Sequence, residues 1–592
     1  MKTRNAFLHK MQKTLFFPRN RLLGKTICSF SKIEKILFCV FFVAITASTL
    51  VILFRVNNML LVEIPIRGGM ITEGVVGTTP PKINPIAVSP FTSPAAESDL
   101  IALVYSGLMQ ALPTGELIPN LAKSYSISED GLTYTFVLKD NLIWHDGMPI
   151  TSDDVKFTVW KAQDPDVGSR QQANWDSVIV ETPDQKTVVF TLTETYAPFL
   201  QNTTMGILPK HHWEKADPER FSDHPLNTRP IGSGPFRVTK IKTNGNDIIE
   251  YYELESFENY ALGTPFIDTI RIMFFTHKED LIEAYKDGRI TNINSISPEK
   301  ARELNNDHRI EYGYLPRIFS AFFNQNEADI FTKKEVRQAL DIAIDREEII
   351  NKVLFGYATE IMGPLPPGSL GYIAQEKTEV LTQEDRITKA QDILEESGWE
   401  RNENGIFIKE MSDNTLALSF SISTTNEAPE LTHIAEILKQ RWEKIGAEVN
   451  IKSFETKDNL KNYAIRPRDY EILLFGEIIG VNSDPYAFWH SSQRLDPGLN
   501  IASYTNVAVD KALERARATS SKEARVKQFK IFQEEIQNDI PAVFLYAPQL
   551  IYATRDSVHG MDLDVVNTPS ERFLNVHEWY LKTERVWKFF AK

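Results

Sequence analysis

Residues 105–157 read YSGLMQALPTGELIPNLAKSYSISEDGLTYTFVLKDNLIWHDGMPITSDDVKF, and this stretch decides the fold class. Within it, every second side chain from Leu132 to Leu138 is apolar, and the side chains between them are mainly polar. This period of two predicts a strand with one buried face. Asp146 and Gly147 follow as a turn signal. The stretch therefore begins with the local pattern of a half-buried strand that ends in a turn.

A helix signal follows this turn. Thr151 and Asp154 form a capping-box pattern in front of DDVKFTVWKAQ. Thr332 and Glu335 repeat the pattern before apolar residues at helical spacing that continue to Leu354. Strands and helices alternate along the chain without a repeat period, which predicts an α/β architecture.

The length of the chain sets its number of cores. Single hydrophobic cores stop growing at about 250–300 residues, so 592 residues predict two or three lobes. A composition that is 42% hydrophobic and 24% charged is typical of globular proteins. Most of the chain is therefore expected to fold around buried cores.

An uncharged apolar run, ILFCVFFVAITASTLVILF, occupies residues 36–54 between Lys35 and Arg55. About 20 helical residues cross the hydrocarbon core of a bilayer. Nine Lys or Arg residues and one acid precede the run, so the positive-inside rule keeps that end in the cytoplasm. Small residues near Ala44 and Ala47 leave a cleaved signal peptide as the alternative. Because the run continues past them, we expect an uncleaved anchor.

The cysteines and the charges are both distributed unevenly between the N-terminal part of the chain and the part that follows the apolar run. The only cysteines are Cys28, before the run, and Cys39, inside it, so lipidation at the end of the run is excluded. The first 35 residues carry a net charge of +8, which leaves −22 for the remainder of a chain at −14. That acidity argues against nucleic acid as a partner. No cysteine after the run is present for disulfides, catalysis or metal binding.

The order of further motifs is more specific than any one of them. After residues 105–157 the chain carries RPIGSGPFRVTKI (229–241), FFNQN (322–326), VRQALDIAIDREEIINKVLFG (336–356), GPLPPG (363–368), AQDILEESGW (390–399), QRWEKIGAEVNI (440–451), YEILLFGEIIGVNSDPYAFW (470–489) and PAVFLYAPQLIYA (541–553). In this order the chain resembles extracytoplasmic solute-binding protein family 5, whose members serve peptide and nickel ABC importers. The resemblance covers residues 72–581. Taken singly, the motifs favour structural roles, with Gly232 and Gly234 as a flexible hinge where a strand begins.

The resemblance implies an α/β, two-lobed periplasmic-binding-protein-like fold with a third small lobe, in which discontinuous lobes are joined by a hinge. Closure on a ligand would be a hinge motion. The expected parts are a basic cytoplasmic N-terminus (1–35), a transmembrane anchor (36–54), a tether (55–79), lobe I (80–104, 227–318 and 544–592), a small extra lobe (105–226) and lobe II (319–543).

The function implied by the resemblance is capture of a peptide or peptide-like solute in the cleft between lobes and its delivery to the permease subunits of an ABC transporter. We expect a monomer without cofactor or metal, held in the cell membrane by one N-terminal helix with the large domain outside the cytoplasm. A surface protein of the same fold with a non-peptide ligand, or with a structural or chaperone role, is the alternative.

An anchored hydrolase is a third possibility, because His211, His212 and Glu214 could supply acid–base or metal chemistry. The chain contains no HExxH, no GxSxG around a serine and no GxxxxGK[ST]. His211 and His212 follow Leu208 and Pro209, which is the pattern of an ordinary helix start. We therefore expect no catalytic residues.

Two ligand-binding positions are implied by family segments that line the cleft. Asn324 follows the strand-like LPRIFSAFF and is expected near the hinge and the cleft floor, with Tyr105 facing it from the first lobe. Their structural alternatives are a turn cap for Asn324 and a core position for Tyr105.

Three further positions concern the amine of a peptide ligand. Peptide-binding relatives place an aspartate three residues before an acidic-Pro pair, and here Val481 precedes Asp484 and Pro485 by that spacing, while Gly480 is the other alignment. Neither has a carboxylate. Asp484 is best interpreted as the N-cap of PYAFWH. Glu477 remains the local acid, on a strand end that faces either cleft or solvent. We expect an N-blocked or non-peptide ligand, or a peptide whose amine meets Glu477.

Overall fold

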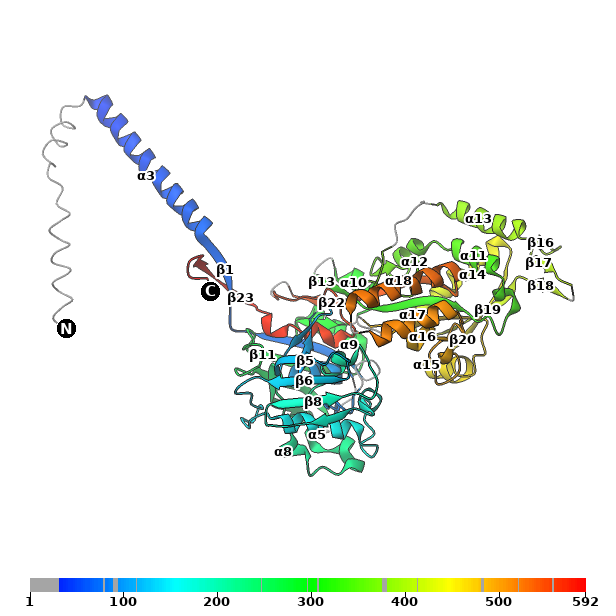
Figure 1. Ribbon diagram of the computed structural model, residues 1–592. Coiled ribbons are helices and arrows are strands. Elements are labelled where there is room, and N and C mark those ends of the chain that lie inside the picture. Colours follow the sequence, from blue (N-terminus) through cyan, green and yellow to red (C-terminus); the bar gives the residue numbers. More distant parts are fainter. Residues whose placement is uncertain are drawn as a thin grey trace. The chain divides into compact units, whose positions relative to one another are not determined.

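The computed structural model describes residues 31–77, 80–88, 94–112, 114–245, 248–294, 296–305, 308–374, 381–412, 414–480, 484–519, 521–555 and 558–591. The chain divides into two compact units, of which the smaller contains 1–66 and 583–592 and the larger 67–582 (Figure 1).

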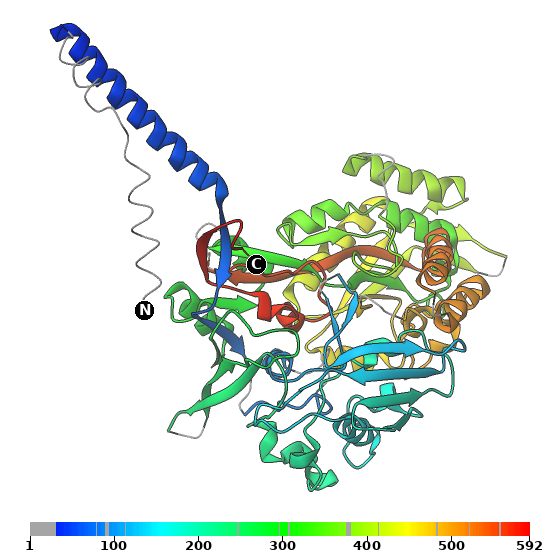
Figure 2. The ribbon, with the colours of Figure 1, turned by 60° about the vertical axis from the view of Figure 1, so that its left-hand side comes forward.

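The smaller unit is built on one long helix, α3 (Lys32–Leu60), which is the blue helix of Figure 2. Ser31 caps its start, since its hydroxyl accepts from the backbone N of Glu34. No residue of α3 is buried, and the helix is long and apolar enough to cross a membrane. Its C-terminal end leads into β1 (Leu61–Ile66), which pairs with β23 (Lys582–Trp587).

The prediction of a tether over 55–79 is wrong for most of its length, because residues 55–60 belong to α3 and residues 61–66 form β1. Residues Met70–Val76 form β2, which lies inside the large sheet between β11 and β12. Five of its seven residues are buried, Glu73 among them. Their burial depends on strands more than 190 residues away in the sequence, so the local pattern could not reveal it.

The larger unit is organised by a twelve-stranded mixed sheet, in the order β20-β19-β21-β14-β22-β12-β2-β11-β10-β9, with β13 and β15 pairing to β22. Its other strands are β9 (Phe236–Thr243), β10 (Ile249–Ser256), β11 (Thr269–Phe275), β12 (Asn292–Asn294), β13 (Arg309–Tyr314), β14 (Arg317–Phe323), β15 (Ala358–Glu360), β19 (Ser419–Thr425), β20 (Glu448–Phe454), β21 (Ile472–Ile478) and β22 (Ala542–Thr554).

One half of this sheet is covered on both faces. Because side chains alternate along a strand, Ala321 and Phe323 of β14 pack into one core, while Phe322 packs into another on the opposite face. The first core also contains residues of α11 (Lys334–Ile342), α12 (Arg346–Lys352), α13 (Gln383–Glu396) and α14 (Pro429–Ile445). The second contains residues of α15 (Lys457–Leu460), α16 (Tyr486–Trp489), α17 (Val507–Ala518) and α18 (Lys522–Asp539).

β22 belongs to both halves of the sheet. Its residues 542–546 pair with β14 and its residues 549–554 pair with β13. The chain therefore passes between the halves near Leu315 and Pro316 on one strand and near Ala547 and Pro548 on the other. The predicted lobe boundaries after residues 318 and 543 lie within a few residues of these changes of partner and stay a prediction.

Residues 105–157 supply β5 and β6 of a separate four-stranded sheet, β5-β6-β8-β7, and the hairpin of β3 (Met109–Ala111) and β4 (Leu117–Pro119). The sheet consists of β5 (Ala122–Ile127), β6 (Thr133–Leu138), β7 (Ile179–Glu181) and β8 (Thr187–Thr191). Tyr134, Phe136 and Leu138 are buried, which confirms the predicted face. α5 (Ser152–Gln163) begins with the predicted capping box of Thr151 and Asp154.

The remaining helices are short: α4 (Ala95–Val104), α6 (Gln172–Trp175), α7 (Phe199–Asn202), α8 (Lys210–Trp213), α9 (Lys278–Lys286) and α10 (Pro298–Leu304). A third small sheet contains β16 (Glu400–Arg401), β17 (Phe407–Glu410) and β18 (Thr415–Ala417).

The capping box predicted for Thr332 and Glu335 is wrong. The Thr332 hydroxyl donates to the carbonyl of Asp329, and Glu335 accepts from Lys409 instead. The predicted helix is also divided, because Asp345 caps the start of a second helix, α12, with its side chain.

Candidate functional site: a pocket between discontinuous segments

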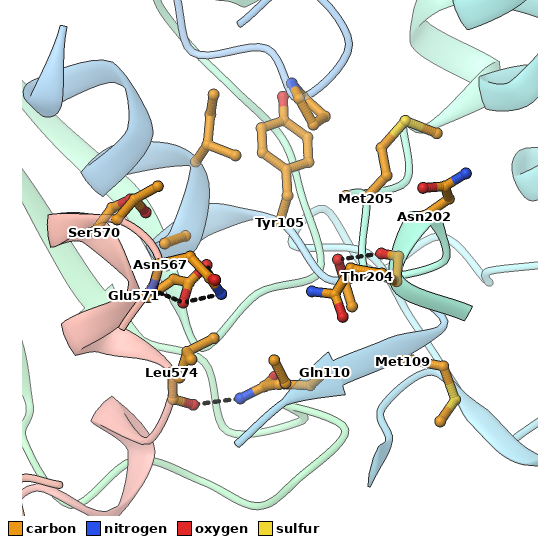
Figure 3. Close-up of a pocket in the computed structure, with 18 of the residues that line it drawn as sticks. Tyr105, Met109, Gln110, Asn202, Thr204, Met205, Asn567, Ser570, Glu571 and Leu574 are labelled. Atoms are coloured by element: carbon orange, nitrogen blue, oxygen red, sulfur yellow. Dashed lines mark hydrogen bonds between the residues drawn. The ribbon is translucent and has the colours of Figure 1, made fainter. Parts of the chain in front are cut away.

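A pocket of about 410 Å³ lies within the larger unit. Its lining comes from residues 85–120, 171–206, 235–260, 479–484 and 567–574, which are distant in the sequence. Most of the polar groups are amides and hydroxyls, and several lining side chains are shown in Figure 3. Such a mixture of apolar surface and a few polar groups is typical of small-molecule sites, and the volume lies within their usual range.

Tyr105 lies in this lining, at the end of α4. Its side chain is 6% exposed, and its hydroxyl donates to the carbonyl of Ile83 at 3.4 Å. Burial raises the pKa of Tyr105, so the phenol is neutral. Tyr105 is therefore a core residue, as its structural alternative proposed, and it is also part of the pocket wall.

The backbone around Tyr105 is packed against two glycines. A Cβ on Gly232 would lie 2.0 Å from the carbonyl oxygen of Val104, and one on Gly234 would lie 2.5 Å from its carbonyl carbon. The N–H of Gly234 donates to that oxygen at 2.7 Å. The prediction that these glycines form a flexible hinge is therefore wrong, because they allow a close contact between two backbone segments.

Gln110 connects two walls of the pocket. From β3 its amide nitrogen donates to the carbonyl of Leu574, as Figure 3 shows. Its amide oxygen accepts from Asn120 at 2.9 Å and from the hydroxyl of Tyr260 at 3.0 Å. Gln110 is thus held by three partners, and its orientation is fixed before any ligand arrives.

A fully buried ion network joins segments whose neighbouring residues line the pocket. The guanidinium of Arg572, in η6 (Pro569–Phe573), donates to both oxygens of Asp99 in α4 and to Glu73 in β2. Glu73 also accepts from the hydroxyl of Tyr552 at 2.7 Å. Burial raises the pKa of Glu73, while Arg572 opposes the rise. The network joins η6, α4 and β2 into one frame.

Glu571, next to Arg572, lines the pocket and was missed by the sequence analysis. Its carboxylate accepts from the backbone N of Asn567 at 2.8 Å and from the side-chain amide of Asn567 at 3.0 and 3.1 Å (Figure 3). Burial raises the pKa of Glu571 to about 7, although these hydrogen bonds lower it. No local sequence signal distinguishes this acid, since only the fold brings it to the pocket.

Asp484 also lines the pocket, and both its oxygens have partners. One accepts from the backbone N of Tyr486 at 3.2 Å, and the other pairs with Arg517 at 2.6 Å. The N-cap of α16 is Pro485, one residue later than predicted. Arg517 in turn lies over the ring of Tyr486, 4.3 Å from its centre. Val481, the other position counted from this motif, lies outside the described residues.

Asn324 does not line the pocket and does not face Tyr105, which corrects the prediction. It is buried at the end of β14, where its amide donates to the carbonyl of Arg468 at 2.9 Å and its oxygen accepts from the backbone N of Asn326. The residue caps a turn. β14 has its other end at the change of partner, so Asn324 lies about 26 Å along the strand from that crossing.

Glu477 lies on the face of β21 that packs against α16–α18, since its neighbour in alternation, Leu473, belongs to that core. Its side chain is neither on the surface nor in the pocket lining, and 5% of the residue is exposed. One carboxyl oxygen has no hydrogen-bond partner among the described residues. Burial raises the pKa of Glu477 well above its usual value, although Arg468 opposes the rise.

A family model for the bacterial extracellular solute-binding proteins, family 5, matches residues 116–496. The chain belongs to this family. It is 27% identical to the oligopeptide-binding protein AppA of Bacillus subtilis over 524 residues, which cover 87% of this chain and 92% of AppA. It is 25% identical to the dipeptide-binding protein of Escherichia coli over 80% of this chain and 89% of that protein.

Solved structures of the family share the fold of this solute-binding protein. The substrate-binding protein CtaP of Listeria monocytogenes matches with a TM-score of 0.72 and 29% identity over 87% of this chain and 99% of CtaP. NikZ of Campylobacter jejuni, solved with nickel and L-histidine, matches with a TM-score of 0.66 and 27% identity over 86% of this chain and 99% of NikZ. The predicted α/β periplasmic-binding-protein fold is thereby confirmed, and a solute-binding protein of this family is not an enzyme.

Among the residues that the structure describes, one group could hold a metal ion, and none of its members lines the pocket. Nε2 of His211 and Nε2 of His212 lie 2.9 and 2.8 Å from the same oxygen of Asp146. The other oxygen of Asp146 accepts from the backbone N of Met148. The histidines are in α8, as the predicted helix start requires, and their contact with Asp146 fixes the turn to that helix.

Proposed function

We propose that this chain is the membrane-anchored substrate-binding component of an ABC importer, which captures a peptide or peptide-like solute in the pocket and delivers it to the permease subunits. The pocket carries the proposal, because segments from five regions of the chain converge on about 410 Å³ of mixed polar and apolar lining. Ile479, Gly480 and Asp484 reach this pocket from the half of the sheet that contains β14 and β21.

The relatives support a peptide as the ligand. AppA is described as an oligopeptide-binding protein and has been solved with a nonapeptide, and the Escherichia coli relative is a dipeptide-binding protein. NikZ holds nickel with L-histidine instead. The polar lining offers amides and hydroxyls that can pair with peptide groups. The anchor in this proposal is α3, none of whose residues is buried.

The proposal is tested by thermal unfolding of the full chain in detergent with a peptide library and with nickel–histidine. A ligand at a hundred times its dissociation constant adds about 2.7 kcal/mol to the stability of the folded state. We expect stabilisation by peptides that is lost when a tryptophan replaces Gly206, whose Cβ position lies 2.7 Å from the Cβ of Tyr105 at the pocket wall. No shift with any peptide, and a shift with nickel–histidine, would replace the peptide by a metal complex as the ligand.

A further inference from the structure

The charged residues in the described pocket lining are all acidic. The described residues that line it include two carboxylates, Asp484 and Glu571, and no lysine, arginine or histidine. Asp484 is already paired with Arg517. Glu571 has no ion-pair partner among the residues that the structure describes. Its carboxylate accepts hydrogen bonds from the side-chain amide and the backbone N of Asn567. One carboxylate in the pocket is therefore without a cation.

Glu571 is held rigidly in this position. Its neighbour Arg572 is fully buried between Asp99 and Glu73, and the carbonyl of Leu574, the residue after η6, accepts from Gln110. These contacts fix the chain on the C-terminal side of Glu571. Figure 3 shows the carboxylate of Glu571 beside Asn567 at the edge of the pocket, on the wall opposite Thr204. A fixed acceptor of this kind loses little conformational entropy when a ligand binds.

Ionisation of the Glu571 carboxyl at this position costs free energy. Burial raises the pKa of Glu571 to about 7, so near neutral pH part of the population is protonated. A cation at hydrogen-bond distance would favour the ionised form and would satisfy the acceptor sites that Asn567 leaves open. The rings of Tyr105 and Tyr260 lie in the same lining and can stabilise a cation through their faces.

We propose that Glu571 binds the ligand's ammonium group, and that the solute of this pocket is therefore an amine whose remaining parts are neutral. This inference rests on the proposed function and names the chemical class of its ligand. The ammonium can be the α-amine of a peptide or the side-chain amine of a basic residue, since both present the same group. A free carboxylate beside the amine is disfavoured, because no cation in the described lining would pair with it.

The test uses calorimetry on the full chain with four trialanine-based peptides. One has a free amine and an amidated C-terminus, one is acetylated and amidated, one is acetylated and amidated with a central lysine, and one has both termini free. We expect the free-amine or the lysine peptide to bind about tenfold tighter than the neutral peptide, and the peptide with a free carboxylate to bind more weakly than its amide. The stronger of the first two identifies the source of the ammonium.

The variant Glu571→Gln should remove this preference, so that the amine peptides bind it no more tightly than the neutral peptide does. Glu578→Gln, an exposed acid in the same segment that does not line the pocket, is the matched control and should bind as the wild type does. Equal binding of neutral and amine peptides by the wild type overturns the inference while the proposed function stands, and this comparison needs no variant that folds. If none of the peptides binds, the peptide function fails, and titration with n-butylamine decides the inference: binding that Glu571→Gln abolishes supports it, and no binding overturns it.

Discussion

The guanidinium of Arg572 meets the carboxylate of Asp99 through two parallel hydrogen bonds of 2.8 and 2.6 Å, and neither side chain is exposed to solvent. The two residues are 473 positions apart in the sequence. Paired geometry of this kind is the strongest that a charged pair forms. With Glu73 as the third member, it fastens the C-terminal segment that carries Glu571 to the strand and helix near the start of the larger unit.

Replacing Arg572 with methionine should destabilise the larger unit by about 3–5 kcal/mol, because Asp99 and Glu73 would remain buried without their cation. Urea unfolding monitored by tryptophan fluorescence measures the change. Arg237→Met is the control, since Arg237 forms an exposed pair with Glu255 and its loss should cost about 0–1 kcal/mol. Equal small effects of both changes would show that the buried network does not hold η6.

A second prediction concerns the close contact behind Tyr105. Gly232→Ala should destabilise the protein by about 1–3 kcal/mol or more, because its Cβ would lie 2.0 Å from a backbone oxygen that a side-chain movement cannot relieve. Gly245→Ala is the matched control, since an added Cβ there meets nothing within 4 Å. Thermal unfolding of the two variants checks this. If Gly232 were a flexible hinge, Gly232→Ala and Gly245→Ala would change the stability by similar amounts.

The sequence predicted those parts of the fold whose signals are local. The face of β6 and the capping box of α5 were predicted correctly, because alternation and capping need only neighbouring residues. β2 was predicted as tether, because a strand buried between two parallel neighbours carries no alternation of its own. Thr332 failed as a cap because its hydroxyl has a closer partner in the carbonyl of Asp329.

The candidate site was less accessible to sequence reasoning than the fold. Tyr105 and Asp484 do line the pocket, but Asn324 and Glu477 were placed by motif position alone, and their side chains point into the protein instead. Glu571 could not have been selected, because its importance comes from the 99–572 contact that brings it to the pocket. Two residues that form an ion pair across such a distance in the sequence leave no periodic pattern by which the pair could be recognised.

The third prediction is a pH dependence of the turn at Asp146. Burial raises the pKa of this carboxyl, but hydrogen bonds from His211, the Met148 backbone and His212 lower it to about 2. The folded value is below the ordinary 3.8, so the contacts stabilise the protein above pH 3.8, and the contribution is lost as the pH falls through about 2. Asp146→Asn should cost on the order of 1 kcal/mol at pH 7, after allowance for solvent screening.

Urea unfolding of wild type and Asp146→Asn between pH 7 and pH 2 checks this dependence. The difference in stability between them should shrink toward the acid end. Glu129→Gln, an exposed acid in a turn of the same segment, should show no such difference. A constant difference for Asp146→Asn across the whole range would show that the aspartate acts through shape and not through its charge.

The fourth prediction concerns the anchor. The full chain should stay in the membrane fraction after an alkaline wash, and protease added to cells without an outer membrane should remove the large unit. Ile45→Arg places a charge near the middle of the apolar run, which costs about 2.5–3.5 kcal/mol in a bilayer, so this variant should be released. Ile45→Leu is its control. Release of a wild-type protein that lacks residues 36–54 would show that the helix is a signal peptide.

The fifth prediction follows from the burial of Glu477. Its folded pKa is above the ordinary 4.5, so the unfolded state releases a proton that the folded state keeps. The wild type therefore loses stability as the pH rises above 4.5, until the folded carboxyl itself ionises. Glutamine has the shape of the protonated acid and does not titrate. Glu477→Gln should accordingly be more stable than the wild type at pH 7, by on the order of 1 kcal/mol, and equal to it at pH 4.

Unfolding of wild type and Glu477→Gln at pH 4 and pH 7 decides between a structural and a ligand-binding carboxyl, with the exposed Glu410→Gln as the control that should change little at either pH. Calorimetry with free and N-acetylated peptides adds the second readout. Because the side chain lies on the face of β21 that packs against α16–α18, the substitution should leave both affinities unchanged. A loss of affinity confined to the peptide with a free amine would mean that Glu477, ionised by that amine, reaches the ligand after the lobes close.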